Sequence, residues 1–307
     1  MKILITGAGG QLGQDLVAAC DPGRDDIIAA DHRGLDVGDR DEVLGAITSL
    51  QPDIVIHAAA WTAVDACESD LDRAWKVNAL GSRHVAEACR LAGAHLCAVS
   101  TDYVFDGTAT TPYTEWDHVN PLSVYGRSKL GGEREIQALL PGASIVRTSW
   151  LCGAGGPNFV RTMLRLAGAG AAGAGAAGAA GAGAAGAAGP AGPTEVRVVN
   201  DQWGCPTFTA DLAQLVRTIA VSRLPGVFHA TNQGATTWYE LARLTFELAG
   251  ADVDRVIPIT TAELDPPRPA PRPAYSVLDN AALRLQGIPL LADHREPIQH
   301  LVKELLQ

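Results

Sequence analysis

Short apolar runs and amphipathic segments alternate along the first half of the chain. Each apolar run is bounded by glycine or polar residues and has the length of a β-strand that is buried on both faces. These runs lie at 2–6, 26–31, 53–59, 95–101 and 144–150. Apolar residues recur at helical spacing between them, over 14–20, 39–50, 71–92 and 124–140. Strands that alternate with helices predict an α/β fold, a Rossmann-like doubly wound parallel sheet.

The second half of the chain has a less regular pattern. Helices are predicted at 210–220, 236–250 and 295–307, and strands at 226–232 and 255–259. The proline-rich segment 263–273 fits neither and is expected to be an extended loop. We expect a dinucleotide-binding domain over residues 1–150, which residues 209–232 rejoin. A smaller α/β domain that binds substrate is expected mostly within 151–307.

Residues 167–189 contain only glycine and alanine. Alanine favours a helix, but each glycine disfavours it by up to about 1 kcal/mol. The tract has no side chain that can carry chemistry. A flexible or weakly helical surface segment is therefore predicted.

Charge and cysteine content narrow the class of protein. The 307 residues include 34 acidic and 24 basic side chains, a net charge of −10 with histidine neutral. Such a balance argues against nucleic acid or an anionic membrane as the main partner. No secretory signal and no membrane-spanning apolar run is visible. The six cysteines form no CxxC pair, so they are expected to be reduced, and a cytoplasmic location is predicted.

A glycine-rich loop follows the first predicted strand. The stretch "GAGGQLG" places Gly7, Gly10 and Gly13 between "KILIT" and the first predicted helix. Glycines at these positions permit a tight turn and a close approach of the backbone, and a helix N-terminus offers free N–H groups to phosphate. The loop therefore predicts a binding site for the pyrophosphate of a dinucleotide.

The residues after the second predicted strand give conflicting evidence on the choice of cofactor. Asp31 ends this strand, where a carboxylate accepts hydrogen bonds from the ribose hydroxyls of NADH. Arg33 lies two residues later, where a guanidinium suits the 2′-phosphate of NADPH. A plain capping or solvated role for Asp31 is the alternative. NADPH and NADH both remain open as the cofactor.

Tyr125 and Lys129 stand four residues apart in "YGRSK" and share one face of the predicted helix. A nearby ammonium is expected to lower the pKa of the tyrosine. Such a tyrosine acts as a general acid toward a carbonyl oxygen. Thr101 ends a predicted strand and is expected to donate a second hydrogen bond to the same oxygen. An ordinary amphipathic helix with an exposed lysine is the alternative.

Longer stretches carry a more specific resemblance. The chain contains "AAAWTAVDACESD", "STDYVFDG", "PLSVYGRSKLGGE", "VVNDQWGCPT" and "RPAYSVLD". With the glycine loop, these stretches resemble the extended short-chain dehydrogenase/reductase family, and more narrowly its reductases of dTDP-4-dehydrorhamnose. The resemblance covers nearly the whole chain. It implies reduction of the C4 ketone of dTDP-4-dehydro-L-rhamnose to dTDP-L-rhamnose by NADPH or NADH.

The resemblance also implies roles for particular residues. The cofactor would be held by a set comprising Gly7, Gly10, Gln11, Leu12, Gly13, Asp31, Asp36, Val37, Ala60, Trp61, Thr62, Tyr125 and Lys129. Thr101, Tyr125 and Lys129 would carry the chemistry. The same three, with Asp102 and Trp150, would hold the sugar. Asn78 would belong to a proton relay or make a local hydrogen bond, and Arg268 and Arg272 would face the diphosphate or solvent.

The Gly/Ala tract departs from the family pattern. Some members bind magnesium at a dimer interface through acidic residues, some of which lie in the stretch that the tract replaces. Asp15 matches one such ligand and Glu195 is a loose candidate. Magnesium is therefore possible but not predicted, and a homodimer is possible. The expected partner is the small dTDP-sugar substrate.

Two other functions compete with this interpretation. The first is another extended short-chain enzyme, a nucleotide-sugar epimerase or a reductase of another 4-keto sugar. The second is a non-catalytic subunit that resembles the regulatory subunit of methionine adenosyltransferase. Thr101, Tyr125 and Lys129 are all present, which favours catalysis over the second alternative.

Overall fold

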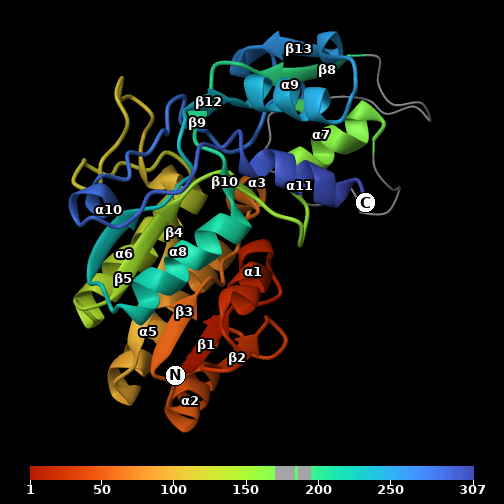
Figure 1. The fold of residues 1–307 in the computed structure, drawn as a ribbon. Helices are drawn as coiled ribbons and strands as arrows, with labels where there is room; N and C mark the ends of the chain where they lie inside the picture. Colours follow the sequence, from red (N-terminus) through yellow and green to blue (C-terminus); the bar gives the residue numbers. More distant parts are fainter. Residues whose placement is uncertain (170–183, 186–194) are drawn as a thin grey trace.

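The computed structural model describes residues 1–169, 184–185 and 195–307. Its main feature is a six-stranded sheet in the order β2-β1-β3-β4-β5-β11, with every neighbouring pair parallel. The strands are β1 (Lys2–Thr6), β2 (Asp26–Ala30), β3 (Ile54–His57), β4 (His95–Thr101), β5 (Ser144–Thr148) and β11 (Gly226–His229). This is the predicted Rossmann-like sheet (Figure 1).

Helices cover both faces of this sheet. One face packs on α1 (Gln11–Ala19) and α8 (Thr209–Val221), which contribute Leu16 and Ile219 to a shared core. The other face packs on α2 (Arg40–Leu50) and α5 (Gly81–Ala92), which contribute Val43 and Val85. The helix α6 (Val124–Leu139) lies beside α5 and follows a serine N-cap at Ser123.

The predicted helix over 71–92 is interrupted. It consists of α4 (Leu71–Ala74), a π-helical turn η1 (Trp75–Leu80) and α5, after a short α3 (Val64–Cys67). A π-helical turn inserts an extra residue into the helical ladder and is frequent at functional sites. Apolar periodicity alone predicts a continuous helix, because it does not register such an insertion.

A second, smaller lobe stands beside the carboxyl edge of the main sheet (Figure 1). Its sheet has the order β13-β8-β7, and β13 pairs with β8 in parallel. Its core includes Met163, Val198 and Phe246. Its elements are α7 (Phe159–Ala167), β7 (Ala184–Ala185), β8 (Val196–Val199), α9 (Trp238–Leu248), β13 (Val256–Ile259) and α11 (Pro297–Leu305).

The remaining elements of the described ranges are short. They are β6 (Leu151–Cys152), β9 (Trp203–Gly204), β10 (Thr207–Phe208), β12 (Thr236–Thr237), α10 (Ala281–Leu285) and the 3₁₀ turns η2 (Asp102–Val104), η3 (Val253–Arg255) and η4 (Thr261–Glu263). Of the proline-rich segment predicted at 263–273 to be an extended loop, Glu263 ends the 3₁₀ turn η4, and residues 264–273 form neither helix nor strand. β11 lies next to β5 in the main sheet. We retain the division into residues 1–150 with 209–232, and mostly 151–307, as a proposal.

The prediction for the Gly/Ala tract falls mostly on residues outside the described ranges. Only 167–169 and 184–185 of the tract are described, and 184–185 pair with β8.

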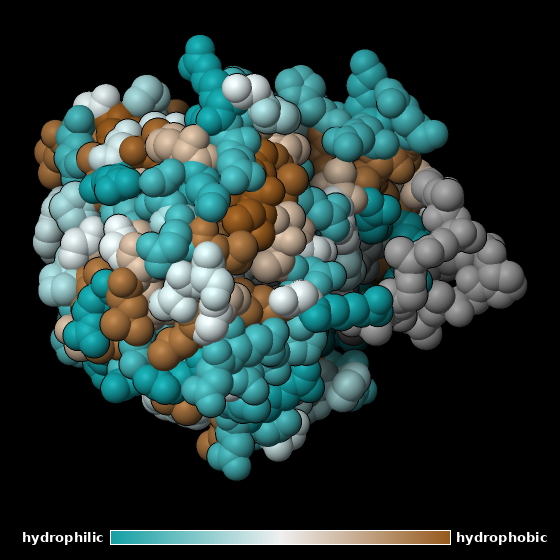
Figure 2. All heavy atoms as spheres, turned by 90° about the horizontal axis from the view of Figure 1, so that it is seen from below, coloured by the Kyte–Doolittle hydropathy of each residue, from teal (hydrophilic) through white to brown (hydrophobic). Residues whose placement is uncertain are grey.

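Hydrophilic residues cover much of the face seen from below, with hydrophobic residues in several groups among them (Figure 2). Within the described ranges, none of the helices combines the length and apolar character needed to cross a bilayer.

Candidate active site

A cavity of about 710 Å³ opens at the carboxyl ends of β1, β3, β4 and β5. In open α/β sheets, ligands bind at this edge, near the point where the strand order reverses. The reversal here lies between β1 and β3. Every residue predicted to bind cofactor or substrate lines the cavity: Gly7, Gly10, Gln11, Leu12, Gly13, Asp31, Asp36, Val37, Ala60, Trp61, Thr62, Thr101, Asp102, Tyr125, Lys129 and Trp150. The structure brings these side chains together, while their individual roles stay predictions.

The glycine loop has no room for larger residues at two of its positions. Gly7 has a φ of +72°, and a Cβ there would lie 2.7 Å from the backbone nitrogen of Ala59. A Cβ at Gly13 would lie 2.1 Å from the carbonyl oxygen of Gly7. These contacts bring the loop against the end of β3 and the first turn of α1. The helix α1 begins without a side-chain cap, and Gln11, Leu12 and Gly13 of its first turn line the cavity, as a binding site for a dinucleotide pyrophosphate requires.

The Asp31 side chain caps its own turn. Its Oδ1 accepts hydrogen bonds from the backbone N–H groups of Arg33 at 3.0 Å and Gly34 at 2.9 Å. One part of the carboxylate is therefore used locally, as the alternative interpretation expected. Asp31, His32 and Arg33 also line the cavity and are exposed. Acidic and basic groups thus both stand at this edge.

Asn78 fixes the loop after β3 to the helix that carries Tyr125. Its Oδ1 accepts from the Trp61 N–H at 2.8 Å, and its Nδ2 donates to the Trp61 carbonyl at 3.2 Å and the Ser128 Oγ at 3.0 Å. Asn78 is buried within the π-helical turn. These partners are 17 and 50 residues away in the chain, so the hydrogen bonds of Asn78 are not local ones.

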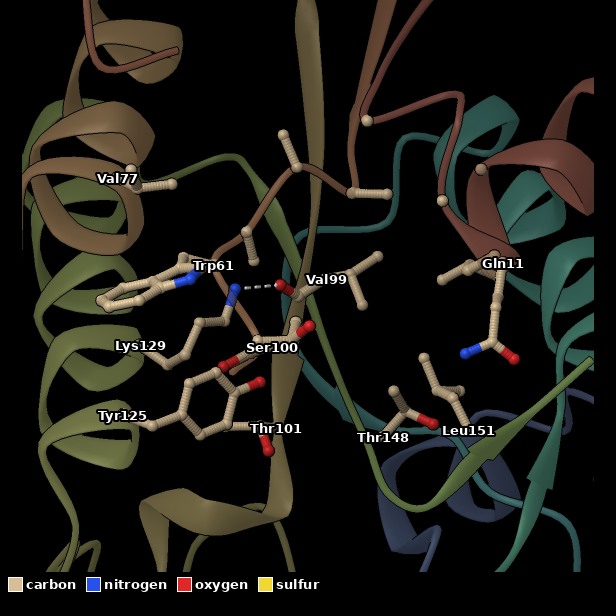
Figure 3. A pocket seen from close by; sticks show the side chains of 18 of the residues that line it. Gln11, Trp61, Val77, Val99, Ser100, Thr101, Tyr125, Lys129, Thr148 and Leu151 are labelled. Carbon is tan, nitrogen blue, oxygen red and sulfur yellow. Dashed lines mark hydrogen bonds between the residues drawn. The ribbon is translucent and has the colours of Figure 1, made fainter. Parts of the chain in front are cut away.

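The side chains of Tyr125 and Lys129 extend from the same face of α6 toward β4. That strand carries Val99, Ser100 and Thr101 (Figure 3). The Lys129 ammonium donates a hydrogen bond to the Val99 carbonyl at 2.8 Å. Thr101 lies at the carboxyl end of the same strand (Figure 3). All of these side chains line the cavity, so the predicted reacting group is assembled in one place.

The expected effect of Lys129 on the pKa of Tyr125 is wrong for this structure. Burial raises the pKa of Tyr125 above its ordinary value, and the nearby Thr101 side chain opposes that rise only in part. Burial also lowers the pKa of Lys129 to about 8, against the opposing charge of Glu133. The physical reason is that desolvation dominates both groups, while the ammonium is directed at a backbone carbonyl.

Asp102 lies buried beside Thr101 and is 2% exposed. Its Oδ1 accepts from the Thr101 hydroxyl at 3.1 Å, and its Oδ2 accepts from the Ser276 hydroxyl at 2.6 Å. A threonine hydroxyl has one proton to donate. With Asp102 ionised, Thr101 therefore donates to Asp102 and accepts from the Tyr103 N–H at 3.2 Å. To donate to a substrate oxygen as predicted, the Thr101 hydroxyl must first give up its hydrogen bond to Asp102.

A buried ion pair supports the reacting group from behind. The Arg147 guanidinium donates two hydrogen bonds to the Glu133 carboxylate, from Nε to Oε1 at 3.0 Å and from Nη2 to Oε2 at 2.7 Å. The Ser100 hydroxyl donates to the same carboxylate. Glu133 lies one turn after Lys129 on α6. This pair joins β4, β5 and α6 directly beneath the cavity.

The opposite wall combines two predicted residues, Gln11 and Trp150, with others that the sequence did not single out, among them Trp238 and Asn158. Trp150 has a φ of +47° and stacks on Trp238 of α9, with ring centroids 3.5 Å apart. Gln11 donates to the Pro157 carbonyl at 2.9 Å and accepts from Asn158 at 3.0 Å. Other unpredicted lining residues are Val77, Val99, Thr148, Leu151 and Phe159. The asparagine cap that precedes α7 is a sequence signal that would have located this wall.

Arg268 and Arg272 are directed toward an acidic residue. Asp65 pairs with Arg272 at 2.8 Å and with Arg268 at 3.4 Å. Neither arginine is among the cavity-lining residues of the described ranges. The expectation that they face a diphosphate is therefore not met here, because the nearer carboxylate binds them. These contacts fasten the proline-rich segment to α3.

The described residues contain no group of three or more histidine, cysteine or acidic side chains arranged to hold a metal. Asp15 lies on α1, and Glu195 lies exposed just before β8. All six cysteines are free and buried.

Comparison with known proteins gives consistent matches over the whole chain. A family model described as "RmlD substrate binding domain" matches residues 1–172 and 189–307, which leaves out most of the Gly/Ala tract. A dTDP-4-dehydrorhamnose reductase of Streptomyces griseus is 42% identical over 303 residues, 97% of this chain and 89% of the relative. A probable dTDP-4,6-dihydroxy-2-methyloxan-3-one 4-ketoreductase of Streptomyces antibioticus is 42% identical over 310 residues, 100% of this chain and 96% of the relative. The crystal structure of dTDP-4-dehydrorhamnose reductase from Bacillus anthracis in complex with NADP has a TM-score of 0.88 and 36% identity, and each chain is covered to 99%.

Proposed function

The chain belongs to the family described as RmlD substrate binding domain, and from that premise we propose that it is an NAD(P)H-dependent reductase of a dTDP-linked 4-keto-6-deoxyhexose. The reaction is reduction of the C4 ketone of dTDP-4-dehydro-L-rhamnose to dTDP-L-rhamnose. The observation that carries the proposal is the joint placement of the glycine loop and the Thr101, Tyr125 and Lys129 group along one cavity.

Each residue of the reacting group has a distinct role in this proposal. Tyr125 donates its phenolic proton to the ketone oxygen, because its pKa is high enough to keep it protonated at neutral pH. The charged ammonium of Lys129, which is positioned by its hydrogen bond to the Val99 carbonyl, holds the cofactor ribose. When bound, the reduced nicotinamide supplies a hydride to the ketone carbon. Trp150 provides an apolar surface for the sugar ring.

The residues on the other side of the cavity hold the cofactor. The glycine loop and the N-terminus of α1 receive the pyrophosphate. Asp31, Asp36 and Val37 lie at the end that receives the adenosine. NADPH and NADH are both accepted as reductant in the proposal, since acidic and basic side chains share this exposed turn.

Cofactor oxidation without any partner protein tests the proposal. The absorbance of NADPH or NADH is followed with dTDP-4-dehydro-L-rhamnose generated in situ, for the wild type and Tyr125→Phe. Turnover by the wild type and loss by the folded variant would support the reductase and its tyrosine. A silent wild type would contradict it, and retention of tightly bound NAD⁺ would then favour an epimerase.

A second substrate is favoured by one observation. The Streptomyces antibioticus relative has the same 42% identity as the Streptomyces griseus relative, and its name gives a different dTDP-linked keto compound. The same assay with that compound ranks the two candidate substrates.

A cytoplasmic location, a possible homodimer and the absence of a nucleic-acid partner stay predictions from the sequence.

A further inference from the structure

The indole of Trp150 is held in a position that its backbone alone does not favour. Trp150 stands two residues after β5 and has a φ of +47°, in the left-handed region that bulky residues rarely adopt. Such a conformation persists only where the surrounding contacts determine it, and such positions cluster at binding and active sites. The Trp150 carbonyl also accepts a hydrogen bond from the Thr207 N–H at 3.2 Å. The contacts of the side chain therefore identify what holds it in place.

Trp238 covers one face of the Trp150 indole. The two rings stack with their centroids 3.5 Å apart and their planes at 9°. Trp238 is 6% exposed and packs with Phe159 in the core of the smaller lobe, with ring centroids 4.7 Å apart. Trp238 opens α9, and this helix start is capped because the Thr237 Oγ1 accepts from the Glu240 N–H at 3.2 Å. Trp238 is therefore a fixed surface against which the indole of Trp150 rests.

Gly204 leaves the space that the same indole occupies. A Cβ at residue 204 would lie 2.5 Å from Cε2 of Trp150 and 2.7 Å from its Nε1, which is closer than real Cβ atoms approach. Gly204 is absent from the glycines with a positive φ, so the indole requires the missing side chain and not the backbone freedom. The strand β9 ends at Gly204 and pairs with β12, which leads directly into Trp238. One pair of short strands thus places both neighbours of the indole.

The held ring borders the same cavity as the reacting group. The strands β4 and β5 are parallel neighbours in which Thr101 pairs with Thr148, and Trp150 follows two residues after Thr148. Thr101, Tyr125 and Trp150 all line the cavity. An aromatic face offers an apolar surface to the C–H groups of a sugar ring, and its position then decides how far the ketone lies from the proton donor. A displacement of about 1 Å lowers the rate by about 10²-fold.

We propose that Trp238 and Gly204 set the position of the Trp150 indole and, through it, the position of the dTDP-keto sugar in front of Tyr125, which rests on the reductase function proposed above. Trp238 acts through Trp150, so it is a positioning residue and not a catalytic one. Trp238 itself borders the cavity, whereas Gly204 is not among the lining residues of the described ranges. The effect of both residues concerns the deoxyhexose ring and not the dTDP part of the ligand.

The test measures the part of binding that depends on the sugar. Isothermal titration gives the Kd of dTDP-L-rhamnose and of dTDP, which lacks the sugar, for the wild type and Trp238→Leu. Leucine keeps an apolar side chain in the core and removes the stacked ring. The Kd of dTDP-L-rhamnose should rise about five- to tenfold, while the Kd of dTDP stays within about twofold. Trp238→Phe keeps a ring at this position and should bring the Kd of dTDP-L-rhamnose back to within about threefold of the wild type.

Gly204→Ala displaces the indole from its other neighbour. Because Gly204 does not line the cavity, this variant acts on the ligand through Trp150. It should raise the Kd of dTDP-L-rhamnose about tenfold, leave that of dTDP within about twofold, and lower kcat for NADPH oxidation by about tenfold or more. Gly45→Ala is the matched control, since a Cβ there meets nothing within 4 Å. Gly204→Ala also keeps the test available if Trp238→Leu does not fold.

Phe246→Leu separates positioning from packing. Phe246 lies on α9, is fully buried in the same core as Trp238, and is not among the cavity-lining residues of the described ranges. This variant should lower the free energy of unfolding and leave both Kd values within about twofold of the wild type.

The outcomes are distinct. A rise in the Kd of dTDP-L-rhamnose alone, in both Trp238→Leu and Gly204→Ala, with Phe246→Leu near the wild type, would support the positioning role. Equal rises for dTDP and dTDP-L-rhamnose would overturn it, since Trp238 would then hold the smaller lobe as a whole. An unchanged Kd for dTDP-L-rhamnose, or the same pattern in Phe246→Leu, would overturn it as well. In these cases, turnover by the wild type leaves the reductase function standing. A wild type that neither binds dTDP-L-rhamnose nor oxidises NADPH would overturn the reductase function and the positioning role with it.

Discussion

The two ends of the cavity are built in different ways. At the reacting end, Thr101, Asp102 and Lys129 are each less than 8% exposed, and their polar atoms bond to neighbouring groups. At the end proposed to receive the adenosine, Asp31 and Arg33 lie in an exposed turn in which Asp31 accepts hydrogen bonds from residues 33–35. Burial fixes the first region, and solvent surrounds the second.

This difference has an energetic consequence. A buried polar group that loses its partner carries the full cost of desolvation, while an exposed charge is screened by water and salt. The chemistry of the site should therefore tolerate few substitutions, whereas its choice between NADPH and NADH should change gradually.

Tyr125→Phe should have the largest effect on activity. The ring still fills its place, but the proton donor is lost, so kcat should fall by about 10²- to 10⁴-fold. Steady-state oxidation of NADPH measures the loss, and circular dichroism confirms the fold. Tyr113→Phe is the control, since that hydroxyl bonds to Asp106 outside the cavity. A loss below about tenfold in Tyr125→Phe would remove the tyrosine from its role.

Glu133→Gln should have the largest effect on stability. It leaves the Arg147 guanidinium, which is 6% exposed, without its anionic partner beneath the reacting end. Breaking a buried ion pair in this way costs about 3–5 kcal/mol of the free energy of unfolding. Denaturant unfolding measures the change. Glu135→Gln on the same helix breaks a more exposed pair with Arg83 and should cost at most about 1 kcal/mol. Equal losses in both variants would contradict the difference in burial.

The charge of Lys129 should make stability depend on pH. Its pKa in the folded protein is lowered to about 8 from 10.5. Below pH 8 the group is charged in both states, and the folded state carries the cost of burying it. Between these values the unfolded chain binds more protons, so stability rises with pH, by at most about 1.4 kcal/mol per unit.

Comparison with Lys129→Met isolates this effect. The difference in unfolding free energy between wild type and variant should shift in favour of the wild type as pH rises from about 8 to 10. The same substitution at the exposed Lys76 controls for the loss of a positive charge. A difference that stays constant over this range would mean that Lys129 is not desolvated in the folded protein.

The sequence predicted the main sheet and its helices more fully than the smaller lobe. The glycine loop, β1 and α1 depend on local patterns, and the i,i+4 spacing of Tyr125 and Lys129 placed both on one helix face. The same spacing does not show where an ammonium points. Its direction toward Val99 depends on β4, which lies nearly thirty residues earlier in the chain. For this reason the position of the pair was predicted correctly and its effect on the pKa was not.

Contacts between distant segments account for the other differences. Asn78, in the π-helical turn, pairs with Trp61 and Ser128, and apolar periodicity reveals neither the turn nor these contacts. Trp238 stacks on Trp150 from a helix nearly ninety residues later. Arg272 had the chemistry of a phosphate ligand, and only the fold shows that Asp65 binds it. A pattern along the chain gives the residue type, and packing selects its partner.

Asp31→Asn should produce the smallest effect, at the exposed end. Asparagine still accepts from the N–H groups of Arg33 and Gly34, so the turn is preserved while the negative charge beside the ribose is removed. Since that charge repels a 2′-phosphate across water, the ratio of kcat/KM for NADPH to that for NADH should rise about two- to fivefold. The effect should shrink at high salt, because exposed charges are screened. Asp26→Asn, at the opposite end of β2, makes the same change of charge far from the cavity and should leave the ratio unchanged. A change of a hundredfold or more in Asp31→Asn would show that this end of the site is as tightly determined as the reacting end, and the contrast between the two regions would then be wrong.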